Sequence, residues 1–400
     1  MFYFIQGINE PTEGLIAQPV RSLLKSWGQN AEQIATFSAL LAMPWALKPV
    51  YGLISDFIPL AGYYRKSYLV LASAITSISL GLLYARDLPT GEVNTLMALL
   101  ILPTIGVAFS DVVVDALMVE KGQPRGLTGV LQSVQWSAIY AATILTGSWG
   151  GYLSAHASQQ DGFLICALLT LFALVLSLTV VREKRSGHSA RDFANTWQTL
   201  RQAVRSRTIL AVGAFLFCWH FNPFSTTVLY MYMTRGLNFG EQFYGNSVSL
   251  IGVGAMVGSL LYGFYCRRVP MAVLIHVSVV MGILSTVAYW LMRDEASAAV
   301  ISLAIGFTTG TGLMVQFDLA ARACPPRTAG TLFAGMMSLM NLAMALSTWL
   351  GGWCYERMLE TWGNPLAFNV LVGIGASFTA LCWLVVPYLK HEQPPATLEV

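Results

Sequence analysis

Twelve long apolar windows run through this chain of 400 residues, and they constrain its fold more than any other feature. Each is about 20 residues long, which is the length that an α-helix needs to cross the hydrocarbon core of a bilayer. Only 11% of the residues are charged, whereas soluble domains carry about 25%, so a soluble fold is excluded. The sequence therefore predicts an all-α polytopic membrane protein with twelve transmembrane helices. The windows are residues 2–22, 33–54, 67–85, 93–118, 127–149, 162–181, 208–233, 243–265, 270–292, 297–319, 328–351 and 366–389.

The lysines and arginines predict how these helices are oriented. With the N-terminus inside, 16 of the 23 lysines and arginines fall on the inner side and 6 on the outer side, and Lys48 lies within a span. Because cytoplasmic loops are enriched in these residues, we expect both termini to be cytoplasmic. No basic stretch of the kind found in cleaved signals precedes residue 2. We therefore expect a multi-pass protein of the cell (inner) membrane.

The windows fall into two sets of six that echo each other. The longest polar stretch, 182–207, separates the sets, and three features recur in the same order at offsets of 203, 202 and 201 residues. A duplicated six-helix unit of this kind is typical of the major facilitator fold, in which substrate binds between the two halves. We expect a six-helix bundle at 1–181, a cytoplasmic linker at 182–207 and a second bundle at 208–400. The recurring features are Asp115 and Asp318, Pro124-Arg125 and Pro326-Arg327, and Gly150-Gly151 and Gly351-Gly352.

Several motifs in the first half resemble a known family. Gly52, Asp56, Gly62 and the basic pair Arg65-Lys66 resemble the major facilitator signature, with a short insertion before the basic pair. The stretches that contain these residues and their neighbours resemble the folate–biopterin transporter family within that superfamily, and the muropeptide permease family is the nearest alternative. The match covers residues 40–155, and the second half matches only in layout. The stretches are 44–68, 110–120, and Leu131-Gln132-Ser133 with Trp136.

This resemblance implies secondary transport of folates, pterins or related organic molecules. We expect a proton-coupled carrier that works by alternating access, with a small-molecule substrate, protons and the lipid bilayer as its partners. We expect a monomer that binds no nucleic acid. A muropeptide-permease-like or other small-molecule carrier is the alternative, and a non-transporting membrane receptor is the remote one.

Six ionisable side chains inside the windows are the first candidates for function. Each costs about 2.5–3.5 kcal/mol to place at the centre of a bilayer, so each needs a reason. Five are acids and one is a lysine, which leaves few cations to recognise an anionic substrate; the nearest others are Arg21 and Arg235, near window ends. The six are Glu10, Glu13, Lys48, Asp111, Asp115 and Asp318.

The first window places a polar stripe on one side of a helix. Gln6, Glu10 and Glu13 are spaced by four and three residues, which puts them on one face. Pro11 and Gly14 should bend or loosen the helix there. We expect this face to line the substrate cavity, with Glu13 as the better candidate for taking a proton or accepting hydrogen bonds from a ligand. The alternative is that Glu10 is merely interfacial.

Lys48 and the two aspartates of the fourth window lie at similar depth. Asp111 and Asp115 are one turn apart, and an ion pair with Lys48 would lower the cost of burying both charges. Such a pair serves gating as readily as ligand contact. We expect Asp111 to face the cavity. Asp115 should join a cytoplasmic network with Arg65, Lys66 and Arg125. Its repeat counterpart, Asp318, should pair with Arg322 or Arg327.

The fifth and seventh windows offer neutral candidates for substrate binding. Asn222-Pro223 in the seventh should break the helix, which membranes tolerate where the chain lines a cavity. His220 is a candidate proton relay or a packing residue, and Phe224 is one of several aromatic side chains suited to stacking on a flat heterocycle. The fifth window adds donors that fit an amide-like ring edge or, equally, helix–helix hydrogen bonds. These are Gln132, Gln135 and Trp136.

Other function classes lack their motifs. The sequence contains no HExxH, GxSxG or GxxxxGKS, and its six cysteines are scattered without a CxxC pair. We therefore expect no metal site, no cofactor, no ATP-driven pumping and no enzymatic activity.

Overall fold

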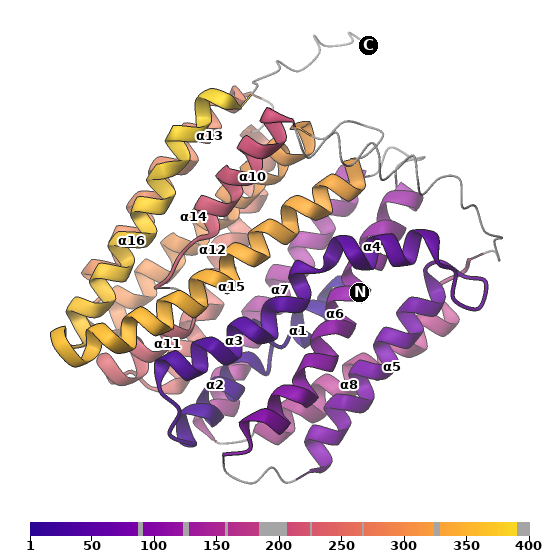
Figure 1. Cartoon of the computed structure of the whole chain (residues 1–400), viewed down its shortest axis with the longest axis horizontal. Coiled ribbons are helices and arrows are strands. Elements are labelled where there is room, and N and C mark those ends of the chain that lie inside the picture. Colours follow the sequence, from indigo (N-terminus) through magenta and orange to yellow (C-terminus); the bar gives the residue numbers. More distant parts are fainter. Residues whose placement is uncertain are drawn as a thin grey trace.

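The computed structural model consists of helices joined by turns and loops, with no strand in the part of the chain that it describes (Figure 1). That part comprises residues 1–86, 91–122, 128–156, 159–183, 206–224, 226–265, 268–323 and 329–389.

The residues before the polar stretch, here called the N half, form eight helices. Asn30 begins α3 with a capping box, in which its side chain accepts from the backbone N–H of Gln33 (2.9 Å) and its own N–H donates to the Gln33 side chain (3.0 Å). Pro49 lies in the first turn of α4, so α3 and α4 form one bent span. The helices are α1 (Phe2–Asn9), α2 (Ala17–Ser26), α3 (Ala31–Ala46), α4 (Lys48–Phe57), α5 (Lys66–Ala85), α6 (Val93–Gly122), α7 (Thr128–Ala155) and α8 (Gln159–Thr179).

The residues after the polar stretch, here called the C half, repeat this layout. Two long helices, α12 and α14, pack closely because glycines at four-residue spacing let their backbones approach. The elements are α10 (Arg207–His220), α11 (Thr227–Met231), the π-helix η2 (Tyr232–Gly236), α12 (Glu241–Tyr265), α13 (Met271–Val287), the 3₁₀ turn η3 (Ala288–Leu291), α14 (Glu295–Ala323), α15 (Ala329–Trp362), α16 (Asn364–Val385) and the 3₁₀ turn η4 (Val386–Tyr388).

Nine helices of the described chain are long and apolar enough to cross a membrane, and each falls on one of the twelve windows. The other three windows are the first, fifth and seventh. The fifth forms the 28-residue α7, which is rich in Gly, Ser and Thr. The first and seventh each form two shorter helices separated by a break, α1 and α2 in one and α10 and α11 in the other. Equivalent spans of the two repeats are therefore interrupted in the same way.

The halves meet mainly at two pairs of helices, α7 with α12 and α3 with α15 (Figure 1), and α15 also contacts α4. At these contacts the two helix backbones lie so close together that no side chain fits between them. A Cβ added to Gly245 would lie 2.3 Å from the carbonyl O of Gly147, and one added to Gly352 would lie 2.1 Å from the Cβ of Ala35. Small residues at these points let the halves approach as closely as neighbouring helices within one bundle do.

Charged contacts close one end of this interface, here called the closed end. Lys25 of the N half pairs with Glu241 of the C half at 3.0 Å, and Arg357 pairs with Glu32 at 3.2 Å. The backbone N–H of Ala31, at the start of α3, donates to a Glu356 carboxylate O at 3.0 Å. Between described residues, every ion pair that joins the halves lies at this end.

Candidate functional site

The break in the first span lies where the sequence predicts a bend. Helix α1 ends at Asn9 and α2 begins at Ala17, with Pro11 and Gly14 in between. Gly14 is needed for the path of the chain, because a Cβ there would lie 2.4 Å from the carbonyl O of Ile8. The interruption is thus complete rather than a kink.

Glu10 organises the broken segment. Its carboxylate accepts hydrogen bonds from the backbone N–H groups of Thr12 (3.2 Å) and Glu13, and from the Thr12 hydroxyl. It also accepts from the indole N–H of Trp45 on α3 at 3.0 Å. These donors hold the break against the second span and satisfy backbone groups that a broken membrane helix would otherwise leave unpaired.

The prediction that Gln6, Glu10 and Glu13 share one helical face is wrong, because the helix ends before Glu10. Gln6 is 9% exposed, and neither its amide N nor its amide O has a partner in the described chain. It lines a polar cavity of about 20 Å³ inside the N half, which has room for about one water molecule. The other polar residues of this cavity are Asn9, Ser73, Thr76, Ser110 and Thr170.

Glu13 lies between the halves. Its side chain is exposed, although Pro11 and Gly14 on either side of it are buried. It lies within electrostatic range of Arg21 of the same span and of Tyr244 on α12 of the C half. Glu13 is therefore open to ligands and lies beside a residue of each half.

Lys48 and Asp111 form the ion pair that the sequence predicts. The Lys48 Nζ lies 2.7 Å from an Asp111 carboxylate O, with side chains 15% and 11% exposed. The same Nζ lies 4.6 Å from the centre of the Trp45 ring, whose indole N–H bonds to Glu10. A continuous set of contacts therefore leads from the break in the first span through Trp45 to the buried aspartate.

Asp115 has different partners from those expected. It accepts hydrogen bonds from the Tyr3 hydroxyl (2.8 Å) and from the Gln135 amide (3.2 Å), not from Arg65 or Lys66. Because α1 packs between α6 and α7, its first turn reaches Asp115 before the loop residues can. Asp115 thus extends the buried charged set beyond Asp111.

Asp56 and Arg65 close the loop after the second span. The Arg65 guanidinium lies 2.5 Å from an Asp56 carboxylate O and donates to the Ser55 hydroxyl at 2.8 Å. The insertion noted in the sequence forms a tight turn in which Leu60 and Tyr63 exchange backbone hydrogen bonds of 3.0 Å each. The signature residues therefore form a compact loop at the end of the second span rather than part of the cavity.

A carboxylate that no sequence motif marks completes this loop. Glu183, just after α8, accepts hydrogen bonds from the backbone N–H groups of Tyr64 (2.9 Å), Arg65 (3.1 Å) and Lys66 (2.8 Å) at the start of α5. It sits more than a hundred residues away along the chain, in a polar stretch with many charges, so no local pattern marks it.

The seventh span breaks at Asn222-Pro223, as the sequence predicts. Helix α10 ends at His220, whose ring Nε2 lies 2.8 Å from the Gln316 amide O on α14. The Asn222 amide donates to the Trp219 carbonyl at 2.9 Å and so caps the broken end.

Phe224 belongs to this break but is turned into the C half, and Asp318 lies on α14. Phe224 is 5% exposed and packs edge-on against Tyr289 and Phe368 inside the C half. Asp318 accepts a hydrogen bond from the Tyr262 hydroxyl at 3.2 Å. The expected partners of Asp318, Arg322 and Arg327, have side chains outside the described residues.

Trp136 bridges the halves on α7. Its ring centre lies 5.0 Å from that of Phe317 on α14 and 5.7 Å from that of Tyr140. The indole N–H of Trp136 and the amide O of Gln135 have no partner in the described chain, so both have hydrogen-bonding capacity left. The Gln132 side chain lies outside the described residues.

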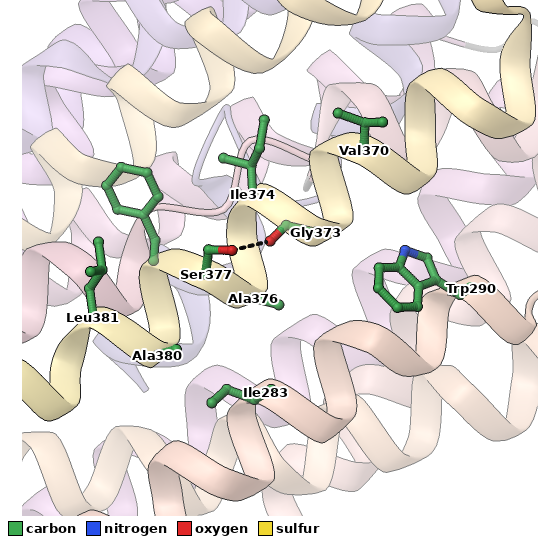
Figure 2. A pocket seen from close by; sticks show the side chains of 10 residues that line it. Ile283, Trp290, Val370, Gly373, Ile374, Ala376, Ser377, Ala380 and Leu381 are labelled. Atoms are coloured by element: carbon green, nitrogen blue, oxygen red, sulfur yellow. Dashed lines mark hydrogen bonds between the residues drawn. The ribbon is translucent and has the colours of Figure 1, made fainter.

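A shallow pocket on the C half is not a polar site. It has a volume of about 660 Å³ and lies between α13 and α16 of the C half (Figure 2). Its lining is apolar apart from Trp290 and Ser377, and the Ser377 hydroxyl already donates to the Gly373 carbonyl at 2.8 Å. A polar heterocycle would find few free partners here, so the broken spans remain the better candidate.

The comparisons with known proteins agree with this architecture. The profile of the BT1 family matches residues 12–387. The folate-biopterin transporter of Synechocystis sp. is 32% identical over 390 residues, which cover 92% of the chain and 77% of the relative. The chain belongs to the BT1 family. Probable folate-biopterin transporter 4 of Arabidopsis thaliana is 24% identical to this BT1-family chain, over 88% of the chain and 86% of the relative.

A solved structure shows the same fold. The D-xylose-proton symporter superposes with a TM-score of 0.75 and 13% identity, and the match covers 98% of each chain. At that identity the likeness extends to the fold alone, which is of the major facilitator type. Family and relatives together make this BT1-family chain a multi-pass membrane transporter and not an enzyme.

Proposed function

We propose that the chain is a proton-coupled secondary transporter of folates or pterins that works by alternating access. The observation that carries this proposal is the set of acids within the broken first span and α6, including the buried Asp111, in a member of a transporter family whose relatives include folate-biopterin transporters. Acids inside a membrane protein mark proton and substrate pathways by default.

In this proposal each part of the site has its own role. Glu13, the open carboxylate between the halves, carries the proton. The pair of Lys48 and Asp111 joins the second span to α6, Trp45 connects it to Glu10 in the first span, and Asp115 extends it. Substrate binds between the broken spans, near Gln135 and Trp136 of α7 and His220 of α10, whose free or exchangeable hydrogen bonds suit the amide-like edge of a pterin.

Alternating access then consists of two bodies that rock about the substrate. We take these bodies to be the bundles at 1–181 and 208–400, joined by the linker at 182–207. The closed end is the face that must open. We further propose twelve spans, cytoplasmic termini, a monomer and residence in the cell inner membrane, as the charge distribution favours.

Uptake by the purified protein tests the proposal. Proteoliposomes should accumulate labelled folate and biopterin when a proton gradient is imposed, and empty liposomes should not. Glu13→Gln and Asp111→Asn should each abolish accumulation while leaving substrate exchange, and Glu360→Gln, at an exposed acid in the last turn of α15, should leave both unchanged. Uptake no higher than in empty liposomes would reject the substrate class. Undiminished accumulation by both variants would reject the proton role.

A further inference from the structure

Arg21 is a buried cation with little to hold it. It lies on α2, is 6% exposed, and makes no ion pair with a described residue. Its only hydrogen bond is a long one, 3.4 Å from Nη1 to the carbonyl O of Thr12, and its Nε–H has no partner in the described chain. A guanidinium has five N–H donors, and a buried charge without partners is expensive, so this arrangement is incomplete as it stands.

The sequence does not predict that Arg21 is buried, because Arg21 lies near the end of the first window, where charges usually belong to loops. The helix shows the reason for its burial. Gln18, Arg21 and Lys25 share one face of α2, and that face meets the C half, where Gln18 and Lys25 both bond to Glu241. Arg21 lies between these contacts and the broken segment, and so just inside the closed end.

The groups around Arg21 come from both halves. Its charge acts on Glu13 in the break and on Tyr230 and Tyr244 of the C half. The Glu241 carboxylate already has two other partners, because it pairs with Lys25 at 3.0 Å and accepts a hydrogen bond from the Tyr230 hydroxyl at 2.8 Å. The other nearby acid, Glu10, is occupied by the donors of the break and by Trp45. Glu13 is therefore the one acid of this group with its carboxylate open.

We propose that Arg21 binds a carboxylate of the transported substrate, and that this carboxylate takes the place of Glu13, which then takes up a proton. The inference rests on the proposed function and names the anion-binding residue of that site. The ligand class is an organic carboxylate, held by the paired N–H donors of the guanidinium in the geometry that arginine favours. It reaches Arg21 from the exposed side of Glu13.

The exchange balances in charge. Substrate brings one negative charge to the guanidinium, and Glu13 loses one when its carboxylate becomes a carboxylic acid with a proton from water. The summed charge of Glu10, Glu13, Arg21, Lys25 and Glu241 together with the bound carboxylate is therefore the same before and after. Binding of substrate and binding of a proton become linked because both depend on the same cation.

The link between carboxylate binding and proton binding predicts different behaviour for two substrates that share the pterin ring. Folate carries carboxylates and biopterin carries none, so only folate uses Arg21. Arg21→Gln should weaken folate binding about 10- to 100-fold, as expected for the loss of charged hydrogen bonds, and should change biopterin binding less than about threefold. Arg21→Lys, which keeps the charge but not the paired donors, should fall between. Arg86→Gln, at an exposed loop arginine of the same half, is the matched control.

The experiment is binding of folate and of biopterin to the purified full chain, followed by tryptophan fluorescence or calorimetry. A selective loss of folate binding in Arg21→Gln is the expected result. Equal loss of both ligands, with a monodisperse protein, would show that Arg21 only supports the fold. Unchanged folate binding would equally overturn the inference.

A second measurement needs no Arg21 variant, and so decides the matter if that variant does not fold. In weakly buffered solution near neutral pH, folate binding to the unmodified protein should take up a proton and biopterin binding should not. Glu13→Gln should remove the folate-dependent uptake. Equal proton uptake with both ligands would overturn the inference. Failure of the unmodified protein to bind either ligand would instead reject the proposed substrate class.

Discussion

At the scale of single residues, the ion pair of Lys48 and Asp111 shows that a buried charge needs a partner of opposite charge. Their side chains are only 15% and 11% exposed, and each depends on the other for its charge partner. The pair could be predicted from the sequence, because a lone lysine and two acids one turn apart at similar depth leave few alternatives. The burial of Arg21 could not, because it depends on which half α2 faces, and hydropathy does not record this.

Lys48→Met should destabilise the protein by about 3–5 kcal/mol, because it leaves Asp111 as an uncompensated buried charge. The double variant Lys48→Met/Asp111→Leu should recover most of that loss. Thermal unfolding in detergent measures both. Arg357→Ala, which breaks an exposed pair, should cost only about 0–1 kcal/mol. A double variant no more stable than Lys48→Met would contradict the pairing argument.

At the scale of the element, the broken spans show what local sequence can specify. Pro11, Gly14 and the Asn222-Pro223 pair mark both breaks, because proline and glycine act on their own backbone. Local sequence does not specify which side of each helix fragment faces the rest of the protein. A periodic stripe across residues 6–13 assumes one continuous helix, so it misplaced Gln6, which turns into the N half.

Gly14→Ala tests whether the break needs a glycine. The added methyl would meet the backbone of Ile8 and Glu10 within 2.4–2.6 Å, so the segment must shift and Glu10 loses its donors. We expect a lower melting temperature and uptake reduced at least tenfold. Gly81→Ala, in α5 with open space around it, should be neutral or should stabilise by up to about 1 kcal/mol. Equal behaviour of the two variants would count against the close approach at residue 14.

Glu183→Ala tests the cap on α5. Three backbone N–H groups would lose their acceptor, so we expect a loss of about 1 kcal/mol, within the range of 0.5–2 kcal/mol found for helix caps. Thermal unfolding detects the change, and Glu360→Ala at an exposed position provides the reference. A cost indistinguishable from that reference would mean that water replaces Glu183 without loss.

At the scale of the whole molecule, sequence features that recur at offsets of about 200 residues predict two equivalent units. The structure shows that the first and seventh spans are both interrupted, as equivalent spans of two such units would be. The closed end could not be predicted from the sequence, because its ion pairs join residues of opposite halves that only the packed structure brings together.

Cross-linking tests whether the closed end opens during transport. Glu32→Cys and Arg357→Cys place one thiol in each half, where the native side chains meet at 3.2 Å. A short bis-maleimide should abolish uptake by the double variant and spare each single variant. Arg86→Cys/Glu92→Cys, a pair within the N half, should tolerate the same reagent. Full uptake by the cross-linked Glu32→Cys/Arg357→Cys protein would rule out opening at this end.

The glycine contacts between α7 and α12 also mean that a substitution far from the ligand site can change how the two halves pack. At Gly245 there is no room for a single methyl group, whose carbon would lie 2.3 Å from the Gly147 carbonyl O and 2.6 Å from the Cα of Gly151. Replacing glycine with alanine or serine takes one nucleotide change, and here it would wedge the halves apart without contacting any ligand. If transport works by the alternating access proposed above, such a wedge would change the populations of the two states, and with them the apparent affinity on each side of the membrane. Proteins that share one binding site would then differ in transport rate through a few small residues at this interface.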